Sequence, residues 1–192
     1  MKDHSISVDQ SRYGSSIVAK YLDTETIKTS KKFYKTTLQY DMTLIKANES
    51  TSDEKVEKLN MEFNIQYRAC IGSLIYLLST RLDLIFAVHN LSKFWSNPGK
   101  VHFEGSVKFL RYIRNNETLG LKYYADIKDA PLSDLLRQDS IKTENWLMAF
   151  YYSSCQDCTN TGRSTGEYII FYQVGPIYHG KNVPGPVAQS SA

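Results

Sequence analysis

Three apolar stripes at helical spacing occupy the centre of the chain and constrain its fold more than any other feature. The first runs from Tyr67 to Leu78, the second from Leu84 to Trp95 and the third from Phe103 to Leu110. Apolar residues three and four positions apart lie on one face of a helix, and that face is buried against a neighbour. The stripes therefore predict three consecutive helices between about residues 65 and 115, which pack as antiparallel neighbours across short turns.

Weaker signals precede this centre. Ser52 is a good N-cap, and the acidic residues after it predict a helix over about 53–62. A short amphipathic piece covers 17–22, where apolar residues again fall at helical spacing. Residues 23–51 have no sustained period and are interpreted as an extended connection.

The pattern changes after the third stripe. Alternating residues predict a short strand over 119–123, and the charged stretch 125–145 is interpreted as a linker with one helical turn at 132–137. Two segments rich in aromatic and β-branched residues, 148–153 and 168–174, predict further strands. Helices followed by strands favour an α+β fold.

Composition excludes several classes of protein. The 192 residues suffice for one domain or two small ones, and the formal net charge of +3 is not that of a dedicated nucleic-acid binder. Three cysteines cannot form a disulfide framework, and no apolar run approaches the length of a membrane span. We therefore expect a soluble intracellular protein, cytoplasmic or nuclear, with no membrane contact.

Cys155 and Cys158 form a C-x-x-C pair, which is compatible with a metal or a redox site. A structural zinc site needs four ligands, and a redox pair needs a helix that starts at the first cysteine. Here a turn sequence follows, and the remaining donors are scattered: Cys70, His89, His102 and His179. We expect neither a metal nor another cofactor.

Three basic residues, Lys108, Arg111 and Arg114, lie beside the third stripe and are candidates for contacts with nucleic-acid phosphates. The alternative is an ordinary solvated helix face. Glu104, four residues before Lys108, is placed to neutralise it, which favours the alternative.

The run from Ser164 to Gly166 is faintly similar to part of a phosphate-binding loop. No GxxxxGK[ST] pattern is present, and no helix is predicted to follow. The run is interpreted as a turn that enters the strand at Tyr168.

The order of particular residues in the centre resembles the segment that follows the polymerase palm in copia-type LTR retrotransposon Pol polyproteins. The resemblance begins with Tyr67–Leu77 and continues through Thr80–Asp83, Leu91–Phe94 and Lys108–Ile113 to Thr118–Tyr123. After the linker, Phe150–Tyr168 resembles the opening of the family's ribonuclease H domain, and Gly175–Ile177 resembles its next hairpin. The resemblance implies a post-palm helical region at 1–124, a linker at 125–145 and an incomplete ribonuclease H-like sheet at 146–192.

Departures from the family pattern bear on activity. Tyr152 stands where the first catalytic aspartate is expected, and the expected glutamate would come within a few residues of Ala192. Ribonuclease H chemistry holds two metal ions with clustered carboxylates, and a phenol with a pKa near 10 is a poor substitute. Four further positions differ from the family: Leu82, Cys155, Thr159 and Asn160.

These departures predict a truncated Pol fragment, pseudogene-like, with no catalytic residues. Two alternatives remain open. In one, the helices still bind an RNA–DNA hybrid weakly and without sequence preference, or associate with an intact Pol. In the other, the sequence is a piece of a longer, active reverse transcriptase and ribonuclease H polyprotein.

Overall fold

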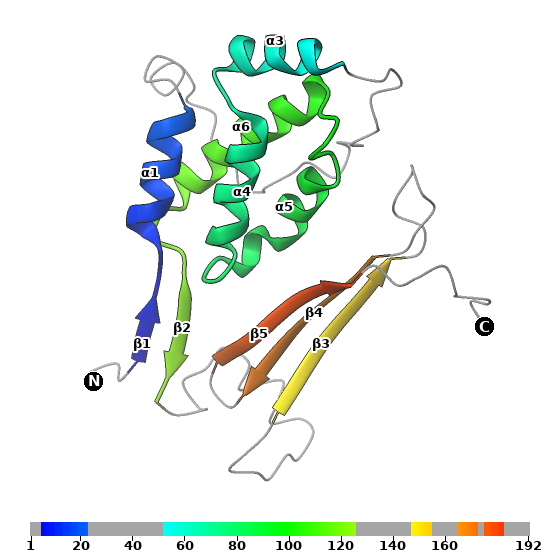
Figure 1. The fold of residues 1–192 in the computed structure, drawn as a ribbon. Coiled ribbons are helices and arrows are strands. Elements are labelled where there is room, and N and C mark those ends of the chain that lie inside the picture. Colours follow the sequence, from blue (N-terminus) through cyan, green and yellow to red (C-terminus); the bar gives the residue numbers. More distant parts are fainter. Residues whose placement is uncertain (1–4, 23–51, 126–146, 155–164, 173–174, 183–192) are drawn as a thin grey trace, which may run out of the picture. The chain divides into compact units, whose positions relative to one another are not determined.

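The structure is a computed structural model that describes residues 5–22, 52–125, 147–154, 165–172 and 175–182 (Figure 1). These residues combine helices with two small antiparallel sheets, which agrees with the expected α+β class. The chain divides into two compact units, one of Asp9–Gly120 and the other of Met1–Val8 with Leu121–Ala192.

The first unit is helical. Its elements are α1 (Ser11–Tyr21), α3 (Asp53–Phe63), α4 (Tyr67–Leu77), the 3-10 turn η1 (Leu82–Leu84), α5 (Ile85–Ser92) and α6 (Lys100–Asn115). The prediction of three consecutive helices in the centre is confirmed by α4, α5 and α6, and the helix expected over 53–62 is confirmed by α3. Predicted features at 23–51, 132–137 and 155–164 lie outside the described residues.

The ends of α3 follow the local chemistry. The Ser52 side chain accepts a hydrogen bond from the Lys55 N–H at 3.4 Å, and Asp53 and Glu54 occupy the first turn. Asn64 ends the helix in the left-handed conformation with φ of 51°. Asparagine tolerates this conformation better than most residues do, so the chain can reverse there into α4.

The prediction that the second helix continues to Trp95 is wrong. α5 stops at Ser92, and the amides of Phe94 and Trp95 bond three residues back to Leu91 and Ser92. This tighter turn rotates Phe94 inward, so Phe94 is buried while Trp95 is 41% exposed. Helical spacing does not predict which side chains are buried here, because the α-helix ends at Ser92, before Pro98.

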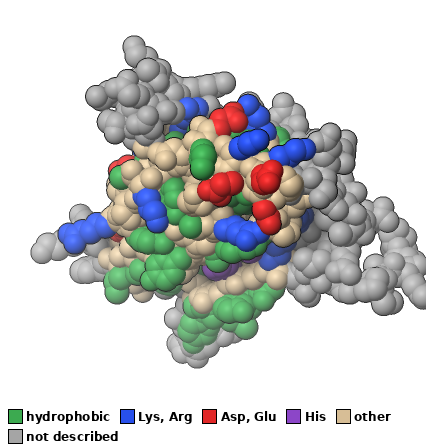
Figure 2. Space-filling model, turned by 45° about the horizontal axis from the view of Figure 1, so that its top comes forward, with side chains coloured by type: hydrophobic (Ala, Val, Ile, Leu, Met, Phe, Trp, Pro, Cys, Tyr) green, Lys and Arg blue, Asp and Glu red, His purple; other side chains and the backbone are tan. Residues whose placement is uncertain are grey.

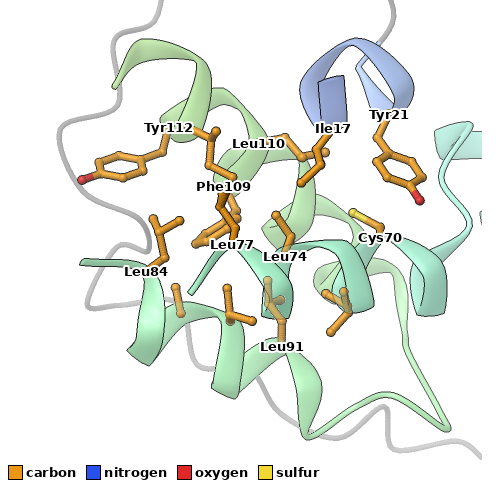
Figure 3. Packing of buried hydrophobic residues seen from close by; sticks show 14 of the residues in the cluster. Ile17, Tyr21, Cys70, Leu74, Leu77, Leu84, Leu91, Phe109, Leu110 and Tyr112 are labelled. Atoms are coloured by element: carbon orange, nitrogen blue, oxygen red, sulfur yellow. The ribbon is translucent and has the colours of Figure 1, made fainter. Parts of the chain in front are cut away.

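The core of the helical unit forms where α1, α4, α5 and α6 meet. Figure 3 shows Ile17, Leu74, Leu91 and Leu110, one from each helix, directed into the same interior. The four residues are at most 3% exposed. Tyr67 adds two polar contacts: its N–H donates to Asn60 Oδ1 at 3.2 Å, and its hydroxyl donates to the Leu91 carbonyl at 2.7 Å. Packing and hydrogen bonding together therefore fix α4 against its neighbours.

The second unit contains both sheets. In the first, β1 (Ser5–Val8) pairs antiparallel with β2 (Leu121–Tyr124), so the strand expected over 119–123 begins two residues late. In the second, β3 (Leu147–Ser154), β4 (Thr165–Tyr172) and β5 (Gly175–Asn182) follow one another in antiparallel order (Figure 1).

β3 and β4 confirm the strands predicted over 148–153 and 168–174 except at their ends, whereas β5 was not among the predicted strands. β4 starts at Thr165, where a turn was expected, and pairs Thr165 and Gly166 with Ser154 and Ser153 of β3. The interpretation of the Ser164–Gly166 run as a turn is therefore wrong for its last two residues. Backbone hydrogen bonding to β3 extends the strand beyond its apolar part, and a paired strand is not a phosphate-binding loop.

Candidate functional site

Lys108, Arg111 and Arg114, the predicted phosphate contacts, all lie on the second half of α6. Successive members are three residues apart, so they occupy one broad side of the helix. Each side chain is half-buried and takes part in a polar, ionic, ring or electrostatic interaction within the chain. The structure therefore groups the three cations but does not present them as a fully exposed basic surface.

The surroundings of α6 mix both signs of charge. Lys100 Nζ lies 2.8 Å from Glu62 Oε1 of α3. The hydrogen bond to Glu62 and the charge of Glu62, followed by the charge of Glu104, raise the pKa of Lys100. On the face drawn in Figure 2, basic and acidic side chains lie next to one another. Interspersed carboxylates weaken the attraction of such a surface for phosphates.

A buried polar network at the C-terminal end of α6, the half of the helix that also carries the three basic residues, was missed by sequence reasoning. Arg81 is 2% exposed and holds Asp83 with two hydrogen bonds, from Nε at 2.9 Å and from Nη2 at 2.8 Å. Arg81 Nη1 donates to the Asn116 carbonyl at 3.0 Å, and the Tyr112 hydroxyl donates to Asp83 Oδ2 at 3.0 Å. The network ties η1 to the C-terminal end of α6.

The hydrogen bonds of this network hold two parts of the chain together. Burial, together with the negative charge of Asp83, raises the pKa of Tyr112, so the phenol stays protonated and donates to the carboxylate. Each of the three guanidinium nitrogens of Arg81 donates a hydrogen bond to a partner within the chain. The resemblance had marked Arg81 and Asp83 only by their order in a motif, and their contact with α6, about 30 residues away, could not be read from that order.

Cysteine and metal chemistry find no support in the described residues. Cys70 is fully buried in the core, and burial raises the pKa of its thiol to about 12, which removes the reactive thiolate. Cys155 and Cys158 lie outside the described residues. Within the part of the chain that the structure describes, no three His, Cys, Asp or Glu residues come together as a metal site.

The strand position that the resemblance aligns with a catalytic aspartate is Tyr152 in β3. Tyr152 is the register partner of Glu167 in β4, and Glu167 is in turn the partner of Lys181 in β5. Glu167 Oε1 lies 3.8 Å from Lys181 Nζ, and their side chains are 21% and 9% exposed. An ammonium group therefore accompanies the carboxylate nearest in register to Tyr152.

None of the described helices has the length and apolar character needed to cross a membrane.

Comparison with known proteins gives partial matches. An alignment over 137 residues, which covers 62% of this chain, is 32% identical to the retrovirus-related Pol polyprotein from transposon TNT 1-94 of Nicotiana tabacum and covers 10% of that protein. An alignment over 71 residues, which covers 32% of this chain, is 35% identical to the retrovirus-related Pol polyprotein from transposon RE1 of Arabidopsis thaliana and covers 5% of it.

A third relative is of a different kind. A stretch of 61 residues, 31% of this chain, is 38% identical to secreted RxLR effector protein 161 of Plasmopara viticola, and covers 43% of that protein. No family model matches the chain, and no solved structure matches it. The chain spans less than half of each of these relatives, and the matches to Pol polyproteins support an origin in a retrotransposon Pol polyprotein.

Proposed function

We propose that the chain is a non-catalytic fragment of a copia-type Pol polyprotein. It corresponds to the region after the reverse-transcriptase palm and to the first strands of a ribonuclease H-like domain. The similarity to Pol polyproteins supports the origin. The helical centre followed by the antiparallel order β3-β4-β5 agrees with the region assigned by the resemblance.

One observation carries the proposal that the fragment has no nuclease activity. At the position aligned with a metal-binding aspartate the chain has Tyr152, and its register partner Glu167 is accompanied by Lys181 at 3.8 Å. Two-metal hydrolysis needs several carboxylates to hold cations. A lysine ammonium repels those cations, and a neutral phenol does not hold them.

Nuclease activity is tested with a labelled RNA–DNA hybrid. The purified chain is incubated with Mg²⁺ or Mn²⁺, beside an active ribonuclease H. We expect no cleavage by the chain, and none by the Tyr152→Asp variant, because one added carboxylate does not complete the site. Cleavage that needs the metal and stops when a chelator is added would refute the proposal.

A second candidate function is weak nucleic-acid binding through α6, favoured by the grouping of Lys108, Arg111 and Arg114 within two turns. About three phosphate contacts would make log K fall against log salt with a slope of roughly −2 to −3. We expect Arg111→Glu with Arg114→Glu to abolish the binding.

The matched control for this second candidate makes the same change of charge elsewhere. Lys55→Glu with Lys58→Glu on α3 also replaces two cations by two anions, and should leave most of the binding intact. Equal losses in both double variants, or tight binding at high salt, would remove α6 as the site.

The remaining alternative is a longer active protein that contains this chain. Sequencing the genomic DNA on both sides of the coding sequence distinguishes this longer protein from the fragment. A continuous open frame that encodes the paired polymerase aspartates upstream would favour the longer protein, and interrupted flanks would favour the fragment.

A further inference from the structure

His102 occupies an unusual position at the start of α6. It is the third residue of the helix, and its Nδ1 accepts a hydrogen bond from the backbone N–H of Gly99, the N-cap residue, at 2.7 Å. The side chain is fully buried, and its ring stacks on Phe94 with 3.9 Å between ring centroids. One imidazole therefore joins the Phe94–Gly99 turn to the first turn of α6.

The hydrogen bond from Gly99 determines which ring nitrogen of His102 carries the proton. An Nδ1 that accepts a hydrogen bond carries no proton, so the neutral ring carries its proton on Nε2. Nε2 is buried, and no hydrogen-bond partner for it occurs among the described residues. The ring is thus held by a single polar contact, and that contact exists only while Nδ1 is unprotonated.

Protonation of His102 opposes the folded arrangement in three ways. A protonated Nδ1 cannot accept from Gly99, and its proton would face the Gly99 N–H. The resulting cation would be buried against Phe94 without a counter-charge. It would also lie at the N-terminus of α6, where the helix dipole disfavours positive charge.

Charged neighbours do not relieve this conflict. Burial lowers the pKa of His102 to about 4, and no charged group among the residues that the structure describes contributes to this shift. The charged side chains nearest along the surrounding segments are exposed: Glu62, Arg68, Lys93, Lys100 and Glu104. His89 on α5 is half-buried, as are Lys108, Arg111 and Arg114 on the second half of α6. Tyr67 and Cys70 on α4 are buried, and burial raises the pKa of both groups, so they stay neutral.

We propose that His102 is an acid-sensitive latch, whose protonation releases the Phe94–Gly99 turn and the first turn of α6 while the remaining helices stay packed. A histidine has an ordinary pKa of 6.5, and that of the latched ring is about 4. The latch is therefore fully effective above pH 6.5 and is lost as the pH falls toward 4. Because opening takes up one proton, the ratio of open to latched chains rises about tenfold per pH unit in this window.

Trp95 provides a reporter inside the turn. Its ring approaches α4, where a Cβ added to Gly72 would lie 3.8 Å from Trp95 Cη2. In the full chain with Trp146→Phe, we expect Trp95 fluorescence to change between pH 6.5 and pH 4.5. The helical far-UV circular dichroism should remain largely unchanged over the same range.

The matched variants are His102→Asn and His89→Asn. Asparagine at 102 places an acceptor near the position of Nδ1 but does not titrate, so its fluorescence should be independent of pH in this window. His89→Asn removes the other histidine of the unit and should retain the transition. A transition that persists in His102→Asn, or a flat profile in the Trp146→Phe chain that retains His102, would overturn the proposal.

A measurement on the unsubstituted chain covers the case in which His102→Asn fails to fold. With ¹⁵N-labelled histidine, NMR should show His102 protonated on Nε2 at pH 7, with a midpoint of titration well below 6.5. A midpoint at or above 6.5, or a proton on Nδ1 at neutral pH, would equally overturn the latch.

Discussion

The helical unit and the three-stranded sheet are both rich in apolar residues, but they use them differently. In α4 the apolar stripe lies on one side, so Cys70, Leu74 and the rest of that stripe are buried against other helices. In the sheet, consecutive residues on β3 are apolar, and Phe150 and Tyr151 are 44% and 62% exposed. Consecutive strand residues point to opposite faces, so such a sheet needs cover on both sides.

The difference extends to polar groups. In the helical unit, two buried polar side chains have specific partners: Tyr67 donates to the Leu91 carbonyl, and Arg81 donates to Asp83. In the sheet, the pair of Tyr178 on β5 and Tyr168 on β4 lies at the surface: Tyr178 is 58% exposed, and the two ring centroids are 5.9 Å apart. A helical stripe thus specifies one buried face, whereas consecutive apolar residues in a strand place apolar side chains on both faces of the sheet and do not specify which segment covers them. We therefore expect the helical unit to be stable and the sheet to be marginal.

The largest effect of a single substitution should come from the shared helical core. Leu74→Ala removes a fully buried side chain and leaves a cavity, so we expect the free energy of unfolding to fall by about 3–4 kcal/mol. Ile75→Ala is the matched control, because Ile75 is the next residue of α4 and is 42% exposed. Denaturant unfolding followed by far-UV circular dichroism measures both. Equal losses would mean that α4 does not bury the face assigned to it.

Loss of the Arg81 network should follow in size. Arg81→Met removes a buried cation that holds Asp83 and Asn116, and we expect a loss of about 2–3 kcal/mol. Lys100→Met is the control, because it breaks an ion pair whose side chains are 59% and 52% exposed. The control should change the unfolding midpoint very little. A neutral result for Arg81→Met would show that η1 is held by packing alone.

How far the sequence predicts the molecule depends on how local the interactions are. Helices α4, α5 and α6 are predictable because each carries its own apolar stripe, and α3 is predictable because Ser52 caps it and acidic residues fill its first turn. β1 was missed because its four residues carry little pattern and their partner, β2, lies more than 110 residues away. β5 carries Pro176 and Gly180, which disfavour strands, and its pairing with β4 outweighs that preference.

The candidate site shows the same limit. Lys108, Arg111 and Arg114 were identifiable because they share one helix. The buried contacts of Arg81 with Asn116 and of Tyr112 with Asp83 join segments about 30 residues apart. His102 could be recognised only as a scattered histidine, because its role depends on burial and on the turn formed by Phe94.

The smallest of the substitution effects should be the loss of one buried hydroxyl. Tyr67→Phe leaves the Leu91 carbonyl without the hydrogen bond it receives at 2.7 Å, and we expect a loss of about 1–2 kcal/mol. Tyr76→Phe removes a hydroxyl from the same helix on a side chain that is 63% exposed. This variant should leave the free energy of unfolding unchanged. If both variants unfold like the unsubstituted chain, the polar contacts of the helical unit do not contribute to its stability.

The unequal stability of the two regions is tested most directly by native-state hydrogen exchange on the full chain. After correction for intrinsic exchange rates, amides of residues 168–172 in β4 should exchange on the order of a hundred times faster than those of residues 70–92 in α4 and α5. Because β4 is the central strand, paired with both β3 and β5, fast exchange there cannot be attributed to an unpaired edge. Equal protection in the two segments would contradict the account, because it would mean that the sheet is as well covered as the helices.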